Sequence, residues 1–265
     1  MTIPLPRLVG MVHLLPLPGA PGFGGSRAQI LDRALGDARV LAEAGFDALM
    51  IENYGDVPFR RGAVEPNVVA EMTVIARAVR AETRLPLGVQ VLRNDAAAAL
   101  GIAAAVDASF IRVNVHTGAM LTDQGVIEGR ADETLRLRAM LGADVRIFAD
   151  VMVKHAVPLA PVTIADAARD AVERGCADAL IVSGSGTGRP VDMADLAAVR
   201  AAVNAPLYIG SGARLESVEA LLAIADGLIV GTAVKADGVT TAPVDPIRAR
   251  AFVAALPRLL PRREP

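Results

Sequence analysis

A short apolar segment followed by a helical one recurs eight times along this chain. The apolar segments are rich in β-branched residues and are bounded by Gly and Pro, which is typical of buried strands. Alternation of strand and helix gives parallel strands joined by right-handed crossovers. Eight such units favour a closed barrel over an open sheet, so the predicted fold class is α/β, a single (β/α)₈ TIM barrel. We predict its strands at residues 8–14, 46–52, 86–92, 110–115, 145–150, 179–183, 206–210 and 227–231.

The segments between the predicted strands have helical patterning and helix-end signals. Several begin with Asp, Asn or Thr, which can cap free amides, and several end at glycines such as Gly45, Gly142 and Gly175. We predict helices at residues 28–44, 67–81, 95–105, 132–141, 163–174, 192–201, 215–223 and 247–256. No linker or break in composition divides residues 1–265, so we expect one barrel domain with a frayed, basic, Pro-rich tail at 257–265.

Composition excludes several classes of protein. The chain has 27 basic and 29 acidic residues, whereas a nucleic-acid binder normally shows a basic surplus. A single cysteine, Cys176, excludes an intrachain disulfide and fits a reducing compartment, so we expect a cytoplasmic protein. No uncharged apolar run approaches the roughly 18 residues of a membrane span, so we expect no integral membrane segment. Base rates for soluble proteins favour a homo-oligomer.

Glycine-rich loops follow the last three predicted strands. Gly210-Ser211-Gly212 ends the seventh strand and Gly231-Thr232 ends the eighth. In (β/α)₈ barrels, these two loops form the recurrent phosphate site, because glycine lets backbone N–H groups approach an anion closely. The loop after the sixth strand adds Ser183, Gly184 and Gly186 to the predicted phosphate-binding residues. The alternative is that these glycines only permit tight turns.

Polar residues end the other predicted strands, at the face where barrels carry their site. Glu52 and Asp150 are acid/base candidates, because a carboxyl group in a partly dry mouth can have a raised pKa; the alternative is a structural ion pair with Arg112 or Arg93. Lys154 could form a Schiff base if desolvated, or lie on a loop beyond the strand. The predicted catalytic residues are Glu52, Asp150, Lys154 and His13. The predicted substrate-binding residues are Asn53, Arg93, Asn94, Arg112, Asn114 and His116.

Three further features have open interpretations. His13, His116 and His155 could bind a divalent metal together with a carboxylate, but no His-x-x-x-His spacing occurs, and we predict no metal and no cofactor. Arg112 and Asn114 alternate along one predicted strand, so both can face the same side, where Glu52 and Asp150 are candidate partners. The aromatic loop 54–59 either contacts a ligand or caps the barrel.

Short motifs are spread along nearly the whole chain: GMVHLLPLPG at residues 10–19, ENYGDVPF at 52–59, LRND at 92–95, FIRVN at 110–114, TDQG at 122–125 with EG at 128–129, AD at 149–150 with VKH at 153–155, SGTG at 185–188 and VGT at 230–232. These motifs resemble those of the BtpA/SgcQ family. The resemblance implies a barrel of the ribulose-phosphate-binding type. It also implies a link to photosystem I biogenesis for the cyanobacterial namesake, to sugar metabolism for other members, and to nucleoside triphosphatase activity for some. It supplies no catalytic residues.

Together these patterns predict an enzyme that binds a phosphorylated small molecule, such as a sugar phosphate, and uses acid/base chemistry of the isomerase, epimerase or lyase type. The alternative is a non-catalytic factor for photosystem I biogenesis or stability, which depends on the resemblance alone. Nucleoside triphosphate hydrolysis is less favoured, because the chain has no G-x-x-x-x-G-K-[ST] loop; its Gly-rich stretch from Ser183 continues into Arg189-Pro190.

Overall fold

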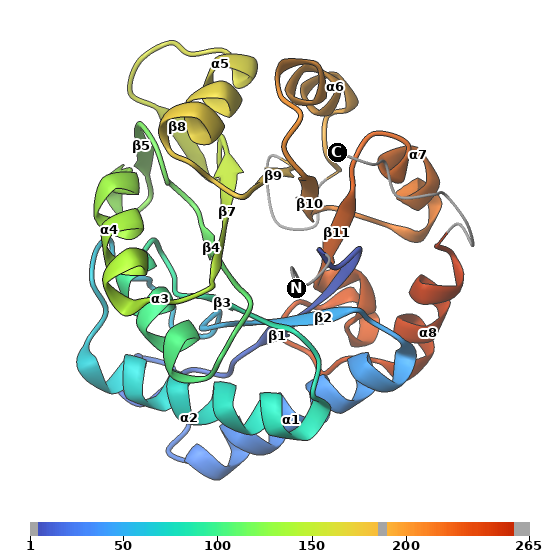
Figure 1. Cartoon of the computed structure of the whole chain (residues 1–265). Helices are drawn as coiled ribbons and strands as arrows, with labels where there is room; N and C mark the ends of the chain where they lie inside the picture. The colour runs from blue at the N-terminus through green and yellow to red at the C-terminus, as the bar shows by residue number, and fades with distance from the viewer. Residues whose placement is uncertain (1–4, 185–189, 257–265) are drawn as a thin grey trace.

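The computed structural model describes residues 5–184 and 190–256, and its main feature is a closed barrel of parallel strands (Figure 1). Around the barrel, the strand order is β1-β11-β10-β9-β7-β4-β3-β2. The barrel strands are β1 (Leu8–His13), β2 (Ala48–Glu52), β3 (Leu87–Gln90), β4 (Phe110–Val113), β7 (Arg146–Val151), β9 (Ala179–Ser183), β10 (Leu207–Ser211) and β11 (Gly227–Val230). Each lies within or overlaps one predicted strand, and the predicted (β/α)₈ barrel is confirmed.

Helices surround the barrel and lie close to their predicted positions (Figure 1). They are α1 (Arg27–Ala44), α2 (Pro66–Thr83), α3 (Ala96–Ala105), α4 (Ala131–Leu141), α5 (Ile164–Arg169) with a π-helical turn (Asp170–Arg174), α6 (Met193–Ala202), α7 (Val218–Leu222) after a 3₁₀ turn (Leu215–Ser217), and α8 (Pro246–Ala254). Asp95, Thr163 and Asp192 cap α3, α5 and α6 through their side chains. Among the helices described, none combines the length and apolar character needed to cross a membrane.

The barrel lumen is packed with apolar side chains from alternate strand positions. Phe110 and Phe148 stack with ring centroids 4.6 Å apart, and Tyr208 adjoins Phe148 at 4.8 Å. The full lumen cluster is Val9, Met11, Ala48, Met50, Phe110, Phe148, Ala179, Ile181, Tyr208 and Ile229. Successive side chains of a strand point to opposite faces, so the next lumen position lies two residues further along each strand. At those positions the chain has His13, Glu52, Gln90, Arg112, Asp150 and Ser183. A polar layer therefore covers the apolar one at the C-terminal end of the barrel.

A small antiparallel sheet outside the barrel was not predicted from the sequence. Its strands are β5 (Ala119–Thr122), β6 (Gly125–Glu128) and β8 (Ala156–Pro158), in the order β6-β5-β8. Met120 and Ile127 pack beneath it against Val115 and Val153.

Candidate functional site

A cavity of about 530 Å³ opens at the C-terminal end of the barrel, within the usual size range of small-molecule sites. The carboxyl ends of β1, β2, β10 and β11 contribute to its walls. At the lumen positions of β10 and β11 in the polar layer, the residues are Gly210 and Gly231. Both glycines line the cavity.

Close packing explains the glycines at positions 210 and 231 better than turn geometry does. A Cβ on Gly210 would lie 2.8 Å from Ser183 Oγ and 2.9 Å from Arg112 Nη2, and one on Gly231 would lie 2.9 Å from His13 Cε1. Gly231 has a φ of −120°, which any residue can adopt. Only Gly212 among these three has a positive φ, 83°, and so requires glycine for its turn.

The predicted phosphate loops border this cavity. Gly210, Ser211 and Gly212 line one part of its wall, and Gly231 and Thr232 line the adjoining part. The 3₁₀ turn Thr232–Val234 begins there, and the first amides of a helical turn have no acceptor within that turn. Ser183 lies behind the cavity wall, with its Oγ 3.5 Å from Arg112 Nη2. Gly184 does not line the cavity, and Gly186 lies outside the described residues.

Glu52 and His13 form a close pair beside the Gly231 loop, because β1 is the barrel neighbour of β11. Glu52 Oε2 lies 3.4 Å from His13 Nε2, and the two residues are register partners at the ends of β2 and β1. His13 Nδ1 lies 3.3 Å from the carbonyl oxygen of Thr240. A carbonyl only accepts hydrogen bonds, so Nδ1 carries the proton of a neutral imidazole and the Nε2 lone pair faces Glu52.

The electrostatics of this pair favour a single shared proton. Burial, with a further contribution from the Lys235 cation, lowers the pKa of His13 to about 3. Burial raises the pKa of Glu52, against the opposing effect of the Arg112 cation. When Glu52 is protonated it can donate to the neutral His13, and the pair then holds one proton beside the cavity. Tyr54, from the predicted aromatic loop, also lines the cavity, with its ring centroid 4.8 Å from that of His13.

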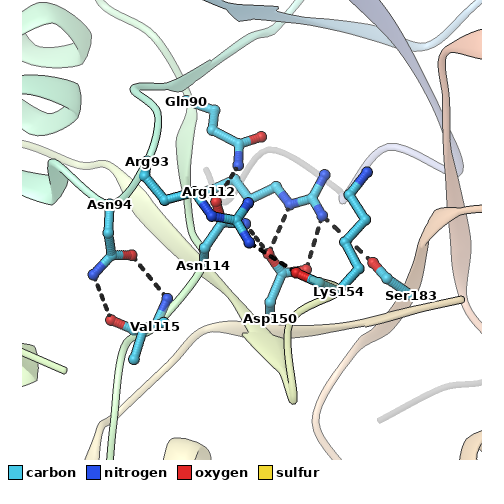
Figure 2. Close-up of polar contacts among 9 residues, drawn as sticks. All are labelled: Gln90, Arg93, Asn94, Arg112, Asn114, Val115, Asp150, Lys154 and Ser183. Atoms are coloured by element: carbon cyan, nitrogen blue, oxygen red, sulfur yellow. Dashed lines mark hydrogen bonds and ion pairs between the residues drawn. The ribbon is translucent and has the colours of Figure 1, made fainter. Parts of the chain in front are cut away.

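Asp150 is bound in a buried network on the other side of the polar layer (Figure 2). Arg112 donates to it from Nε at 3.1 Å and from Nη2 at 2.8 Å, and Asn114 Nδ2 donates to it as well. Arg112 and Asn114 thus point to the same side of β4, and of the two candidate partners, Glu52 and Asp150, both of them bind Asp150. Of the two interpretations of Asp150, this geometry favours the structural ion pair.

Gln90 extends the same network and was missed by the sequence analysis. Its Nε2 donates to Asn114 Oδ1 at 3.1 Å, whereas its buried Oε1 has no hydrogen-bond partner within residues 5–184 and 190–256. Gln90 and Glu52 are register partners on β3 and β2. A polar residue two positions after the lumen glycine Gly88 was the available sequence signal.

Lys154 contributes its side chain to the cavity wall, although it follows β7 by three residues. Its main-chain carbonyl accepts a hydrogen bond from Arg93 Nη2 at 2.7 Å (Figure 2). Burial, followed by the nearby Arg112 cation, lowers the pKa of the Lys154 amine. Arg93 does not line the cavity itself, but it contacts the wall through this hydrogen bond to Lys154.

Three predicted substrate-binding residues connect loops instead of lining the cavity. Asn53 accepts from the Leu92 amide at 2.7 Å, and Asn94 exchanges two hydrogen bonds with the main chain of Val115. His116 Nε2 lies 2.7 Å from the Gly175 carbonyl oxygen, at the outer side of the barrel. The sequence placed these residues at strand ends, but it could not show that their polar atoms form hydrogen bonds to the main chain of neighbouring loops.

The rim of the cavity contains cations that the sequence analysis did not single out. Arg214 lies after β10, and Arg248 lies on α8. Together with Arg112 and Lys154, they outnumber the acidic lining residues, Glu52 and Glu216. Among the described residues, no group of three or more His, Cys, Asp or Glu side chains is arranged to hold a metal ion.

Comparison with known protein families and sequences gives a consistent result. The model of the BtpA family matches residues 6–258. The uncharacterized protein TK2179 of Thermococcus kodakarensis is 50% identical over 93% of both chains. The Photosystem I biogenesis protein BtpA of Synechocystis is 46% identical, covering 94% of this chain and 87% of the relative. The putative sgc region protein SgcQ of Escherichia coli is 34% identical over 93% of this chain and 92% of the relative.

Solved structures resemble the barrel at low sequence identity. A thiamine phosphate pyrophosphorylase from Pyrococcus furiosus aligns with a TM-score of 0.58 and 16% identity, covering 94% of this chain and 95% of the other. Phosphoribosyl anthranilate isomerase from Thermus thermophilus aligns with the same TM-score and 14% identity, covering 94% and 97%. These likenesses concern the fold alone, which is a closed (β/α)₈ barrel.

Proposed function

This chain belongs to the BtpA family, and we propose that it is an enzyme that binds a phosphorylated small molecule and moves a proton on it. The phosphate binds to the loops Gly210–Gly212 and Gly231–Thr232, and Glu52 with His13 transfers the proton. The reaction is of the isomerase, epimerase or lyase type, because each of these begins with proton transfer beside a carbonyl or hydroxyl group.

One observation carries the proposal: the Glu52–His13 pair and both glycine loops line the same cavity of about 530 Å³. In the protonated state the pair can act as a general acid, and after losing its proton it can act as a general base. Arg112, held in place by Asp150, presents a fixed positive charge on the cavity wall. That charge stabilises negative charge developing on a bound substrate.

The names of structural neighbours support the phosphate part of the proposal by analogy. The matched barrels include a thiamine phosphate pyrophosphorylase, a phosphoribosyl anthranilate isomerase and an orotidine 5'-monophosphate decarboxylase. Each of these names refers to a compound that is a phosphate ester. Because a fold hosts many functions, the analogy supports the ligand class and not the reaction.

A second candidate function is favoured by the relative from Synechocystis, which is named for photosystem I biogenesis. On this hypothesis the barrel is a binding module for a photosynthetic complex. It predicts that the chain co-purifies with photosystem I subunits and that Glu52→Gln leaves this association unchanged. Loss of the association in that variant would instead connect it to the cavity.

Phosphate binding is tested by thermal shift with inorganic phosphate and sugar phosphates. A ligand at about 100 times its Kd stabilises the folded state by about 2.7 kcal/mol. Ser211→Asp places a negative charge in the cavity wall and should abolish the shift. Val74→Asp, on the exposed face of α2, adds the same charge elsewhere and should retain it. Equal shifts in both variants would refute the assignment of the phosphate to these loops.

Proton transfer is tested with the phosphorylated ligand that gives the largest thermal shift. Exchange of substrate hydrogen with deuterated solvent, followed by NMR, reports proton abstraction without knowledge of the product. We expect exchange with the native chain and its loss in Glu52→Gln, while the thermal shift by that ligand persists. Unchanged exchange in the variant would remove Glu52 from the mechanism.

A further inference from the structure

The chain contains 25 arginines and only two lysines, Lys154 and Lys235. Arginine provides the surface ion pairs of the described residues, including those of Arg27, Arg39 and Arg136. An arginine side chain stays protonated in proteins, whereas a lysine amine can lose its proton when it is buried. Because this chain otherwise uses arginine for positive charge, we asked what a lysine provides at each of these two positions.

Lys235 has a structural role. Its Nζ lies 2.6 Å from Asp37 Oδ2, and the side chain is fully buried. Asp37 Oδ1 accepts a further hydrogen bond from the Val244 amide at 2.7 Å. Lys235 thus fixes the loop after β11 to helix α1, in a place without contact to the cavity. Lys154 remains as the lysine whose side chain reaches the proposed substrate.

The position of Lys154 suits chemistry as well as charge. Figure 2 shows its side chain extending away from the main-chain contact with Arg93, which anchors its backbone. It shares the cavity wall with Glu52 and Arg112. Burial and the neighbouring Arg112 both disfavour the charged amine, so a larger share of it is neutral and nucleophilic.

We propose that Lys154 is a catalytic nucleophile that forms an imine with the aldehyde or ketone group of a phosphorylated substrate. This inference rests on the proposed function and narrows its substrate class to phosphorylated carbonyl compounds. The phosphate at Gly231–Thr232 and the carbonyl at Lys154 occupy two parts of one cavity.

The reaction balances with groups on the cavity wall. The neutral Nζ attacks the carbonyl carbon, and the carbonyl oxygen takes the proton of the Glu52 carboxyl group to give a carbinolamine. Loss of the hydroxyl with a proton as water leaves a protonated imine and a Glu52 carboxylate. The positive imine nitrogen then draws electrons from an adjacent C–H or C–C bond, and the Glu52 carboxylate accepts the released proton. Hydrolysis by water reverses the first steps and restores the amine.

The test uses pyridoxal 5'-phosphate as a probe, because it carries both an aldehyde and a phosphate. The folded chain is incubated with the probe, any imine is reduced with borohydride, and the adduct is counted by intact mass and located by peptide mapping. With two lysines and the terminal amine as the only primary amines, the assignment is direct, and Lys235 is an internal control. We expect one adduct per chain, on Lys154, and suppression by inorganic phosphate.

Lys154→Arg is the matched variant, because it keeps the positive charge and removes the nucleophile. We expect its adduct to fall to the background level of the terminal amine, while inorganic phosphate still raises its melting temperature. Labelling of Lys235 or the terminal amine in preference to Lys154, or no label on a chain that phosphate stabilises, would overturn the imine proposal alone. Labelling of Lys154 that phosphate does not suppress supports the nucleophile and counts against the phosphate site.

Discussion

The guanidinium of Arg112 donates two hydrogen bonds to the carboxylate of Asp150, at 3.1 and 2.8 Å, with both side chains buried in the barrel lumen. Asn114 and Gln90 continue this network across β4 and β3. A buried charge pair adds little net stability when it is intact, but removal of one partner leaves a charge without compensation. The network therefore holds the cavity wall in one geometry and makes the barrel sensitive to either partner.

Asp150→Asn should lower the free energy of unfolding by about 3–5 kcal/mol, because it leaves the Arg112 charge buried and unpaired. Urea denaturation measures the change. Asp132→Asn is the control, since Asp132 pairs with Arg136 at 3.2 Å on the exposed face of α4. Its cost should stay below about 1 kcal/mol. Similar effects of the two variants would mean that the buried pair is not a structural element.

The pH dependence of stability should report the buried, neutral His13. Its pKa is lowered from 6.5 to about 3 in the folded chain, so between these values the unfolded chain binds one more proton. Stability from this group is present above pH 6.5 and is lost as the pH falls, by about 1.4 kcal/mol per pH unit.

Comparison with His13→Asn isolates this effect, because the other titrating groups are common to both chains. Urea denaturation across the acid range should give two curves that converge as the pH falls, since the native chain loses stability faster. Parallel curves would mean that His13 becomes protonated in the folded state without penalty.

Much of the fold could be predicted from local pattern. The barrel strands are short β-branched runs between Gly and Pro, and the helix caps at Asp95, Thr163 and Asp192 are visible as residue types. The sheet β6-β5-β8 could not be predicted, because Met120 and Ile127 share their apolar cluster with Val153, which is distant from both in the sequence. Such packing is set by tertiary contacts rather than by periodicity.

The sequence predicted where the site residues lie, but it did not predict which of them form pairs. Strand ends identified Glu52, Asp150, Lys154 and His13, yet either carboxylate could have paired with Arg112. The register between β1 and β2 aligns His13 with Glu52, whereas β4 brings Arg112 beside β7 and Asp150. The register between strands depends on the closure of the barrel and cannot be predicted from the sequence of a single strand. The close packing of Gly210 and Gly231 against side chains of the polar layer could not be predicted for the same reason.

Gly210→Ala should destabilise the chain by about 1–3 kcal/mol through overpacking. The new Cβ would meet Ile181 Cγ2 at 2.3 Å as well as the Arg112 guanidinium, so the phosphate-induced thermal shift should also shrink. Gly36→Ala in α1 is the control, because nothing lies within 4 Å of the added methyl group. It should stabilise the helix by about 0.5–1 kcal/mol. A Gly210→Ala chain as stable as the native one would show that the wall can relax.

Gly231→Ala tests whether the glycine is needed for the Glu52–His13 pair or for the phosphate loop beside it. The added Cβ would lie 2.9 Å from His13 Cε1 and 3.3 Å from Nε2, so the imidazole has to leave its packed position unless the loop yields. A displaced ring loses part of the burial that is the main cause of its lowered pKa, and we expect the His13 pKa to rise from about 3 toward 6.5. Titration of imidazole resonances by NMR measures this change, with His13→Asn identifying the signal among three histidines. Because His116 and His155 lie elsewhere, their resonances should titrate as in the native chain. An unchanged His13 titration would mean that the Gly231 loop yields instead of the ring, and that the glycine serves the loop rather than the proton pair.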